Sequence, residues 1–367
     1  MLIHSTLVRW RNEMNMNIGT VALEFLPISL IRAFSSKRIA RLTYRYAQRE
    51  YPEHNDVGSR VRFYLRSLFS LQPTALWFQL LDQHPFLRKC LKHEPEMSEK
   101  LHRPYRRAGF TCMERFRLLR DHIKVCERLG WSELMASFYG KPLEIACFAD
   151  RNGHPFRLIL ARPGQFGKEG EIAMHLMDGE VRLYSTCFSF RLDNGLQELD
   201  IGSIQGPSMA DARQRIRDLT RDLHGLRPRS LILECLRAIA SSSGCSRLRA
   251  VGNSNHIYRS LRKRRSIAFD YDAFCKEEPG TVQDGRDWLI PVQLEVRPLN
   301  EIPSKKRAEA LRRRTLLVEL GNQIQAKTVS AAVHDWVRAD PLRPQSYDLG
   351  DRNGYLGSRI KLTALSV

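Results

Sequence analysis

Residues 204–258 read IQGPSMADARQRIRDLTRDLHGLRPRSLILECLRAIASSSGCSRLRAVGNSNHIY. The segment begins at the end of a predicted strand and continues through two predicted helices separated by the turn His224–Arg229. It returns as a short strand, Arg247–Val251, before a polar loop. Strand, helix and strand in this order bring polar side chains and free backbone N–H groups to one end of a sheet, where α/β proteins bind ligands. The segment therefore predicts a crossover within a sheet and a ligand-binding edge.

Upstream of this segment the sequence pattern predicts an antiparallel meander. Asn152-Gly153, Asp178-Gly179 and Asn194-Gly195 tolerate positive φ and close tight hairpins between strand-like runs. The predicted strands of the meander, together with a late strand, are Leu143–Ala149, Phe156–Ala161, Glu171–Met177, Arg182–Phe190, Leu199–Gln205 and Trp288–Val296. The pattern predicts an α+β fold with a mixed, mostly antiparallel sheet flanked by helices, whose core spans about residues 141–296.

Helices are predicted on both sides of that core. Apolar residues at helical spacing predict an N-terminal helical region over residues 1–82, an amphipathic helix at Arg115–Leu129 and a basic helix at Lys305–Ile324. The intervening segment His84–Pro104 has the composition of a turn-rich connector. These boundaries divide the chain into the helical region 1–82, a domain over 83–324 and a C-terminal tail over 325–367.

The charge balance is unusual for a globular chain. Of 367 residues, 59 are Lys or Arg and 40 are Asp or Glu, which gives a formal net charge of +19. A surplus of this size favours an anionic partner such as nucleic acid, anionic lipid or a phosphorylated ligand, or it reflects a compositional preference for arginine. The eight cysteines form no CxxC pair and read as small buried hydrophobic residues in a reducing compartment, so no metal site is predicted.

The N-terminal part also contains an apolar run at residues 18–34. Glu24, Pro27 and Arg32 interrupt this run, so it is too short and too broken to span a bilayer. It is expected to be a helix packed on the main domain, with an interfacial amphipathic helix as the alternative.

The first candidate site lies at the turn before the second helix of the opening segment. Arg227 and Arg229 flank the N-terminus of a helix that begins at Pro228, where unpaired N–H groups and the helix dipole favour an anion. Two guanidinium groups at this position suit a phosphate or a carboxylate. The alternative is a structural cluster in which both arginines pair with Asp222 and Glu234.

The second candidate site follows the strand Arg247–Val251. His256 is a candidate general base and Tyr258 a candidate proton donor, with Asn253 and Asn255 placed to bind substrate. Asx-turns that cap a short helix are the structural alternative for these residues. Residues 252–256 resemble the G-x-S-x-G nucleophile elbow but lack its second glycine, which argues against a hydrolase.

Two further features bear on anionic ligands. The loop Arg162–Lys168 is rich in glycine, but Glu169 follows Lys168, so the spacing of a phosphate-binding loop is absent. Basic clusters at residues 259–265, 304–307 and 312–314 could hold phosphate groups. These clusters lack interleaved aromatic residues, so a small anionic ligand or the inner-membrane surface is favoured over nucleic acid.

Several stretches resemble the VirK/YbjX family of Gram-negative bacteria (DUF535). They are His84-Pro85, Leu183–Ser189, Gly202–Gly206, His224–Arg229 and Ile302–Arg307, and the resemblance covers about residues 83–323. It implies a cytoplasmic protein that associates peripherally with the inner membrane. It also implies a role in virulence and in resistance to cationic antimicrobial peptides.

The order of elements resembles, more weakly, the acyl-CoA-dependent N-acetyltransferases (GNAT). In that superfamily two strands splay apart to admit the acyl donor, and a helix N-terminus holds its pyrophosphate. The resemblance implies an acyl-CoA cofactor and a Tyr258 that protonates the departing thiolate. Residues 205–208 do not spell the usual pyrophosphate motif. The cofactor contacts it implies are Gln205, Gly206, Gly225, Arg227, Arg229 and Ser230.

Together these features give three hypotheses. The first is an acyltransferase-like factor acting on envelope or amine substrates. The second is a non-enzymatic basic protein that binds anionic lipid or nucleic acid. The third is a degenerate fold that scaffolds a partner.

Overall fold

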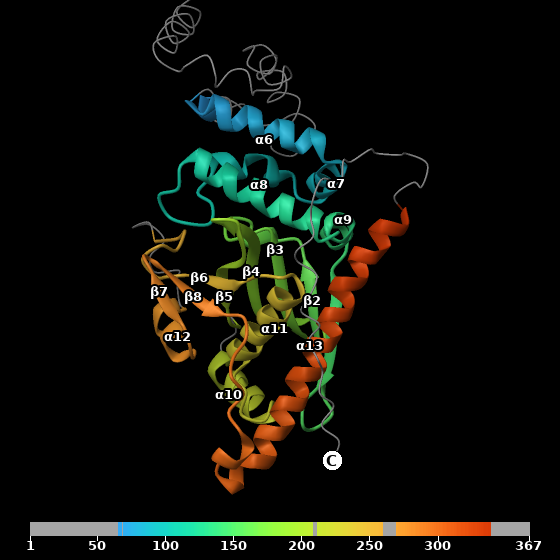
Figure 1. Cartoon of the computed structure of the whole chain (residues 1–367), viewed down its shortest axis with the longest axis vertical. Helices are drawn as coiled ribbons and strands as arrows, with labels where there is room; N and C mark the ends of the chain where they lie inside the picture. Colours follow the sequence, from blue (N-terminus) through green and yellow to red (C-terminus); the bar gives the residue numbers. More distant parts are fainter. Residues whose placement is uncertain (1–64, 68, 208–210, 260–268, 339–367) are drawn as a thin grey trace, which may run out of the picture.

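The computed structural model describes residues 65–67, 69–207, 211–259 and 269–338. The predicted apolar run at 18–34, most of the helical region 1–82, and most of the tail 325–367 lie outside the described residues. Within them, a layer of helices precedes an eight-stranded sheet, and a long helix follows it (Figure 1). The predicted α+β class is confirmed.

The N-terminal helices form a layer that covers one end of the sheet, at the top of Figure 1. Its elements are α6 (Leu71–Gln83), α7 (Pro85–His93), the 3-10 helix η1 (Pro95–His102), α8 (Cys112–Arg128) and α9 (Ser132–Gly140). The predicted amphipathic helix is α8, and a capping box between Thr111 and Glu114 fixes its start. The expected connector His84–Pro104 is wrong, because Pro85 and Pro95 each occupy the first turn of a helix.

The strands form one sheet in the order β1-β2-β3-β4-β5-β6-β8-β7. Their bounds are β1 Leu143–Ala149, β2 Pro155–Ala161, β3 Ile172–Asp178, β4 Val181–Asp193, β5 Leu196–Gln205, β6 Arg247–Val251, β7 Val282–Asp284 and β8 Asp287–Pro291. Five antiparallel strands form the predicted meander, and its turns carry positive φ at Gly153, Gly179 and Gly195. The late strand ends at Pro291, earlier than expected, and pairs with the unpredicted β7.

The crossover leaves β5 through two helices and returns as β6, parallel to β5. The helices are α10 (Ala212–Asp222) and α11 (Pro228–Ser242), and α12 (Tyr271–Glu277) follows β6. Leu231, Leu233 and Ile239 bury α11 in the main core, which explains its nearly continuous apolar sequence.

The last described element, α13 (Ser304–Arg338), runs alongside the sheet (Figure 1). It follows the short 3-10 helix η4 (Leu299–Glu301) and extends fourteen residues beyond the predicted end at Ile324. It packs on α11 and β1, and its buried residues Ala310, Leu316, Leu320 and Ile324 form the contact face. The helix therefore closes the core along α11 and β1.

Candidate functional site

The pairing between the parallel strands β5 and β6 stops before β5 ends, because β6 itself ends at Val251; we call this point the separation of the strands. They are paired from Glu198 to Ile201 on β5 and from Arg247 to Ala250 on β6. Beyond Ile201, β5 continues to Gln205 beside β4 alone. The edge of β5 that faces β6 is met there by Tyr271, whose hydroxyl accepts a hydrogen bond from the Ile204 N–H at 3.2 Å. This separation of the strands defines the candidate site.

A bulge in β5 lies at the same point. The register between β4 and β5 shifts at Gly202, which adds one residue to β5 and bends it. A Cβ atom at Gly202 would overlap the backbone carbonyl of Glu169 and the guanidinium of Arg106. Because backbone cannot yield as a flexible side chain does, only glycine fits this position. The bulge thereby lets the loop that carries Glu169 approach the separated strands.

Three buried polar side chains converge beside the bulge without completing one another's hydrogen bonds. Glu169, Ser203 and His256 are 1%, 0% and 3% exposed. Among the described residues, both carboxylate oxygens of Glu169, the Ser203 hydroxyl and Nε2 of His256 have no hydrogen-bond partner of good geometry. Nε2 of His256 lies 3.6 Å from Oε1 of Glu169. Buried polar groups without hydrogen bonds destabilise the folded protein. A polar ligand atom that bonded to these groups would remove that cost.

Burial shifts the pKa values of Glu169 and His256 so that the neutral form of each side chain is favoured. Burial raises the pKa of Glu169 to about 7, although the Ser203 hydroxyl and the Arg106 charge oppose the rise. Burial, with a contribution from Arg107, lowers the pKa of His256 to about 4. A carboxyl group that titrates near neutrality is suited to accept a proton from a substrate.

The hydrogen bonds of His256 indicate its tautomer. Its Nδ1 accepts the backbone N–H of Tyr258 at 3.3 Å. We therefore assign the proton of the neutral ring to Nε2, which faces Glu169. The Nε2–H of His256 then points toward Glu169 without reaching hydrogen-bond distance, so the group placed to take up a proton is Glu169. The ring of His256 is held by stacking on Tyr271, with centroids 5.0 Å apart.

Tyr258 lies at the edge of this group and is half-buried. Its ring is 5.8 Å from that of His256, and the Lys168 ammonium lies 5.9 Å from its centroid. Burial raises the pKa of Tyr258, with a further contribution from Glu169. The phenol is therefore protonated at neutral pH and able to donate.

The two predicted asparagines have structural contacts. The Asn253 side chain bonds Asp270 at 2.7 Å and accepts the Tyr271 N–H, which fixes the start of α12. Asn255 donates to Asp287 at 2.9 Å. The structure thus occupies both ends of the Asn253 amide and the N–H of the Asn255 amide.

A buried network of ion pairs holds the loop that carries His256 in place. Arg106 and Arg107 both pair with Asp200 on β5, at 2.5 and 2.7 Å, and Arg107 also holds Asp287 at 2.9 Å. The carbonyl of Asn255 accepts the Ala108 N–H at 3.0 Å. The N-terminal layer therefore fixes the position of His256.

The predicted anion site at the start of α11 lies at a separate corner. Arg227 and Arg229 both bond one carboxylate, Glu277, rather than the expected pair. Asp222 pairs instead with Arg151 and Arg221, and Glu234 pairs with Arg237. Two guanidinium groups share one exposed carboxylate, and the Arg229 charge also acts on Glu278, where it opposes the rise in pKa that burial causes.

The other predicted cofactor contacts divide between β5 and this turn. Gln205 is exposed at the end of β5, and a Cβ on Gly206 would lie 3.2 Å from the ring of Tyr184. The Arg229 charge reaches Tyr184, where it opposes the rise in pKa that burial causes. Gly225 has φ +75° in the turn, and Ser230 donates its N–H to the Arg227 carbonyl.

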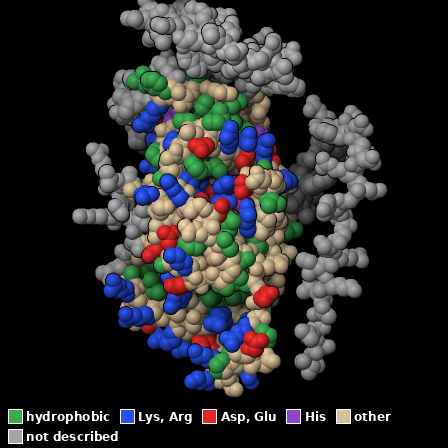
Figure 2. Space-filling model, turned by 60° about the vertical axis from the view of Figure 1, so that its left-hand side comes forward, with side chains coloured by type: hydrophobic (Ala, Val, Ile, Leu, Met, Phe, Trp, Pro, Cys, Tyr) green, Lys and Arg blue, Asp and Glu red, His purple; other side chains and the backbone are tan. Residues whose placement is uncertain are grey.

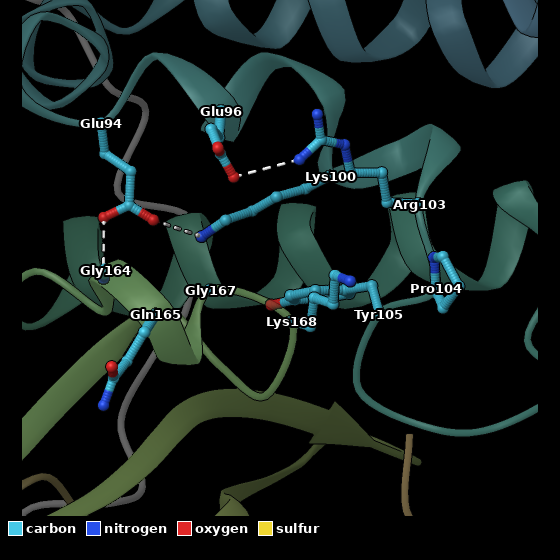
Figure 3. Close-up of a pocket in the computed structure, with 10 residues that line it drawn as sticks. All are labelled: Glu94, Glu96, Lys100, Arg103, Pro104, Tyr105, Gly164, Gln165, Gly167 and Lys168. Atoms are coloured by element: carbon cyan, nitrogen blue, oxygen red, sulfur yellow. Dashed lines mark hydrogen bonds and ion pairs between the residues drawn. The ribbon is translucent and has the colours of Figure 1, made fainter. Parts of the chain in front are cut away.

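A small pocket of about 100 Å³ lies on the other side of the loop before Glu169. None of the predicted site residues line it; its walls come from residues 94–105 and 164–168. Lys100 and Glu94 approach each other there, as do Arg103 and Glu96 (Figure 3). The Lys100 ammonium also donates hydrogen bonds to both carboxylate oxygens of the buried Glu171, each at 2.9 Å.

Glu169 was missed by the sequence analysis. The sequence pattern identified Glu169 only as the residue after Lys168 that does not match the motif of a phosphate-binding loop. Its burial depends on the bulge at Gly202, seen only when β5 is folded beside β4. Among the described residues, no group of three or more His, Cys, Asp or Glu side chains is arranged to hold a metal ion. In the same part of the chain, no helix has the length and apolar character needed to cross a membrane.

Comparison with known proteins places the chain in a family. The family described as "Protein of unknown function (DUF535)" matches residues 53–326. The uncharacterized protein YbjX of Escherichia coli K12 is 31% identical over 263 residues, which are 70% of this chain and 80% of YbjX. An uncharacterized protein of Haemophilus influenzae is 24% identical over 299 residues, 78% of this chain and 97% of that protein.

A third relative, "Membrane protein LapB" of Mannheimia haemolytica, is 24% identical over 207 residues, 54% of this chain and 86% of that protein. No solved structure matches the chain at a significant level. The family match and the identity with YbjX show that this chain belongs to the DUF535 family.

Proposed function

We propose that the protein is an acyl-CoA-dependent N-acyltransferase whose reaction takes place where β5 and β6 separate. The observation that carries the proposal is the buried group of Glu169, Ser203 and His256, with its unsatisfied polar atoms beside the free edge of β5. The strand order, with one parallel pair flanked by antiparallel strands, supports the likeness to the N-acetyltransferase layout.

In this proposal the donor's amide chain lies along β5 beyond Ile201. It replaces the bond from Ile204 to Tyr271, and so forms the kind of strand addition that a free sheet edge offers. The anionic end of the donor lies toward Arg229 and Arg227, where a phosphate would replace the exposed carboxylate of Glu277.

Glu169 takes the proton from the acceptor amine, and His256 orients and stabilises the carboxylate as a donor. The amine nitrogen forms a bond to the thioester carbonyl carbon, the carbon–sulfur bond breaks, and Tyr258 donates a proton to the leaving thiolate. An amine that becomes an amide loses its positive charge. Acylation of amines would therefore account for a role in resistance to cationic antimicrobial peptides and in virulence.

The test begins with binding. Coenzyme A and acetyl-CoA should raise the melting temperature of the wild-type protein through mass action. Replacing Arg227 and Arg229 together by Ala should abolish this rise and leave the unliganded melting temperature nearly unchanged, because both side chains lie on an exposed carboxylate. The control is Arg88→Ala with Lys92→Ala, which removes two exposed charges from α7.

Catalysis is tested by thiol release from acetyl-CoA with a lysine-rich peptide as acceptor. Glu169→Gln should lower the rate by roughly 100-fold or more, the range expected for loss of a general base. Tyr258→Phe should lower it less. No thermal shift at millimolar coenzyme A, together with no thiol release, would reject the proposal.

A further inference from the structure

An excess of positive charge lies at the end of the molecule formed by α10 and the first turns of α13. We call this surface the basic end and define it by Arg213 and Arg217 on α10 and by Lys305, Lys306 and Arg312 on α13, all of them exposed. Figure 1 places both helix segments at the lower end, and Figure 2 shows Lys and Arg side chains gathered there. The turn that follows α10 lies close to α13, because a Cβ at Gly225 would lie 3.1 Å from Oε1 of Glu309.

The charges of the basic end are not neutralised within the described part of the chain. Neighbouring arginines have carboxylate partners: Arg215 pairs with Asp178, and Arg221 with Asp218 and Asp222. Of the ion pairs among the described residues, none involves the five side chains of the basic end. Five unpaired cations on one surface repel one another, so binding an anionic surface would stabilise this arrangement.

Exposed aliphatic side chains on α13 favour a lipid surface over nucleic acid. Leu311 and Val318 on α13 are 52% and 61% exposed. They are seven residues apart, about two helical turns, so they lie on the same face of the helix. Aliphatic side chains beside Lys and Arg are typical of helices that lie in the headgroup region of a bilayer. Surfaces that bind single-stranded nucleic acid instead present aromatic rings for base stacking.

We propose that the basic end docks the protein on an anionic phospholipid bilayer. The cations of α10 and α13 contact the headgroups, and Leu311 and Val318 enter the boundary with the acyl chains. This inference does not depend on acyl transfer, because the docking surface excludes Glu169, His256 and Tyr258.

The test compares two variants of the full-length protein that lose the same charge. The first is Arg213→Gln, Arg217→Gln, Lys305→Gln and Arg312→Gln. The control removes four exposed charges from α7 and α8, at the other end, as Arg88→Gln, Lys92→Gln, Arg117→Gln and Lys124→Gln. Binding is measured by flotation with vesicles of phosphatidylglycerol and phosphatidylcholine, and with pure phosphatidylcholine vesicles, at low and high salt.

The wild type should bind the phosphatidylglycerol vesicles at low salt and lose them at high salt. Each Lys or Arg near an anionic surface contributes roughly fivefold in affinity, so the first variant should bind at least about tenfold more weakly. The control should stay within about threefold of wild type. Leu311→Ser with Val318→Ser should weaken binding while leaving its salt dependence intact.

Three results would overturn the proposal. They are the absence of vesicle binding by the wild type, equal losses in both four-residue variants, and tighter binding of polyuridylate with the same dependence on the four residues. Circular dichroism and melting temperature confirm that each variant is folded. A variant that keeps its coenzyme A thermal shift but loses vesicle binding separates this surface from the proposed reaction site.

Discussion

Glu169 is a carboxyl group held in the protein interior beside a histidine that is itself kept neutral. Its burial makes the ionised form unfavourable, so the folded protein holds this proton to higher pH than the unfolded chain does. His256 has the opposite tendency, because burial makes its protonated form unfavourable. The two effects on stability therefore have opposite signs.

The sign of each effect follows from linkage. The pKa of Glu169 is 4.5 in the unfolded reference and about 7 when folded, so its contribution to stability is lost as the pH rises between these values. The pKa of His256 falls from 6.5 to about 4, so its contribution is lost as the pH falls through that window. Between about pH 4.5 and pH 6.5 the two contributions largely offset each other.

Replacing Glu169 by Gln should expose the contribution of His256. Relative to wild type, Glu169→Gln should gain stability as the pH rises from 4.5 to 7, by up to about 3 kcal/mol. Urea denaturation at a series of pH values measures this difference. A difference that is constant with pH would show that Glu169 titrates normally.

At the scale of elements, the bulge of β5 decides whether the site can form. It lies where the pairing with β6 stops, and the backbone of Glu169 lies against Gly202. The pattern of alternating residues predicted β5 but gave no indication of the bulge, because Gly202 and Ser203 fit an ordinary strand equally well.

The requirement for glycine at position 202 can be tested with a matched pair. Gly202→Ala should destabilise the protein by about 3 kcal/mol or more, because the added methyl overlaps backbone that cannot move away. Gly321→Ala, in α13 with open space around it, should instead stabilise by up to about 1 kcal/mol through helix propensity. Equal effects of the two changes, measured by denaturation, would contradict this account of the bulge.

At the scale of the whole molecule, α13 closes the core by packing on α11 and β1. Its buried side chains extend from Ala310 to Thr328, beyond the boundary at residue 324 that the sequence suggested. Thr328 also bonds Ser242 at the end of α11, at 3.1 Å. The helix is therefore part of the domain along its described, buried length.

A truncation series tests this role. A chain that ends at residue 303 should not unfold cooperatively, because the three large buried side chains Leu316, Leu320 and Ile324 stabilise by roughly 4.5–9 kcal/mol, comparable to the whole stability of a domain. A chain that ends at residue 329 should keep a melting temperature within a few degrees of the full chain. Calorimetry distinguishes the two, and cooperative unfolding of the shorter chain would show that the core closes without α13.

The sequence by itself determined the class of fold, the meander, the crossover helices and the placement of His256 next to a strand end. These features depend on local period, turn chemistry and helix ends, which neighbouring residues specify. It did not determine the partner of Arg227 and Arg229, which came from Glu277 some fifty residues away. Nor did it reveal Glu169, whose pKa depends on burial among β5, His256 and Arg106, residues far apart along the chain. Burial and charge are summed over neighbours in space, so only the tertiary structure brought these groups together and decided their chemistry.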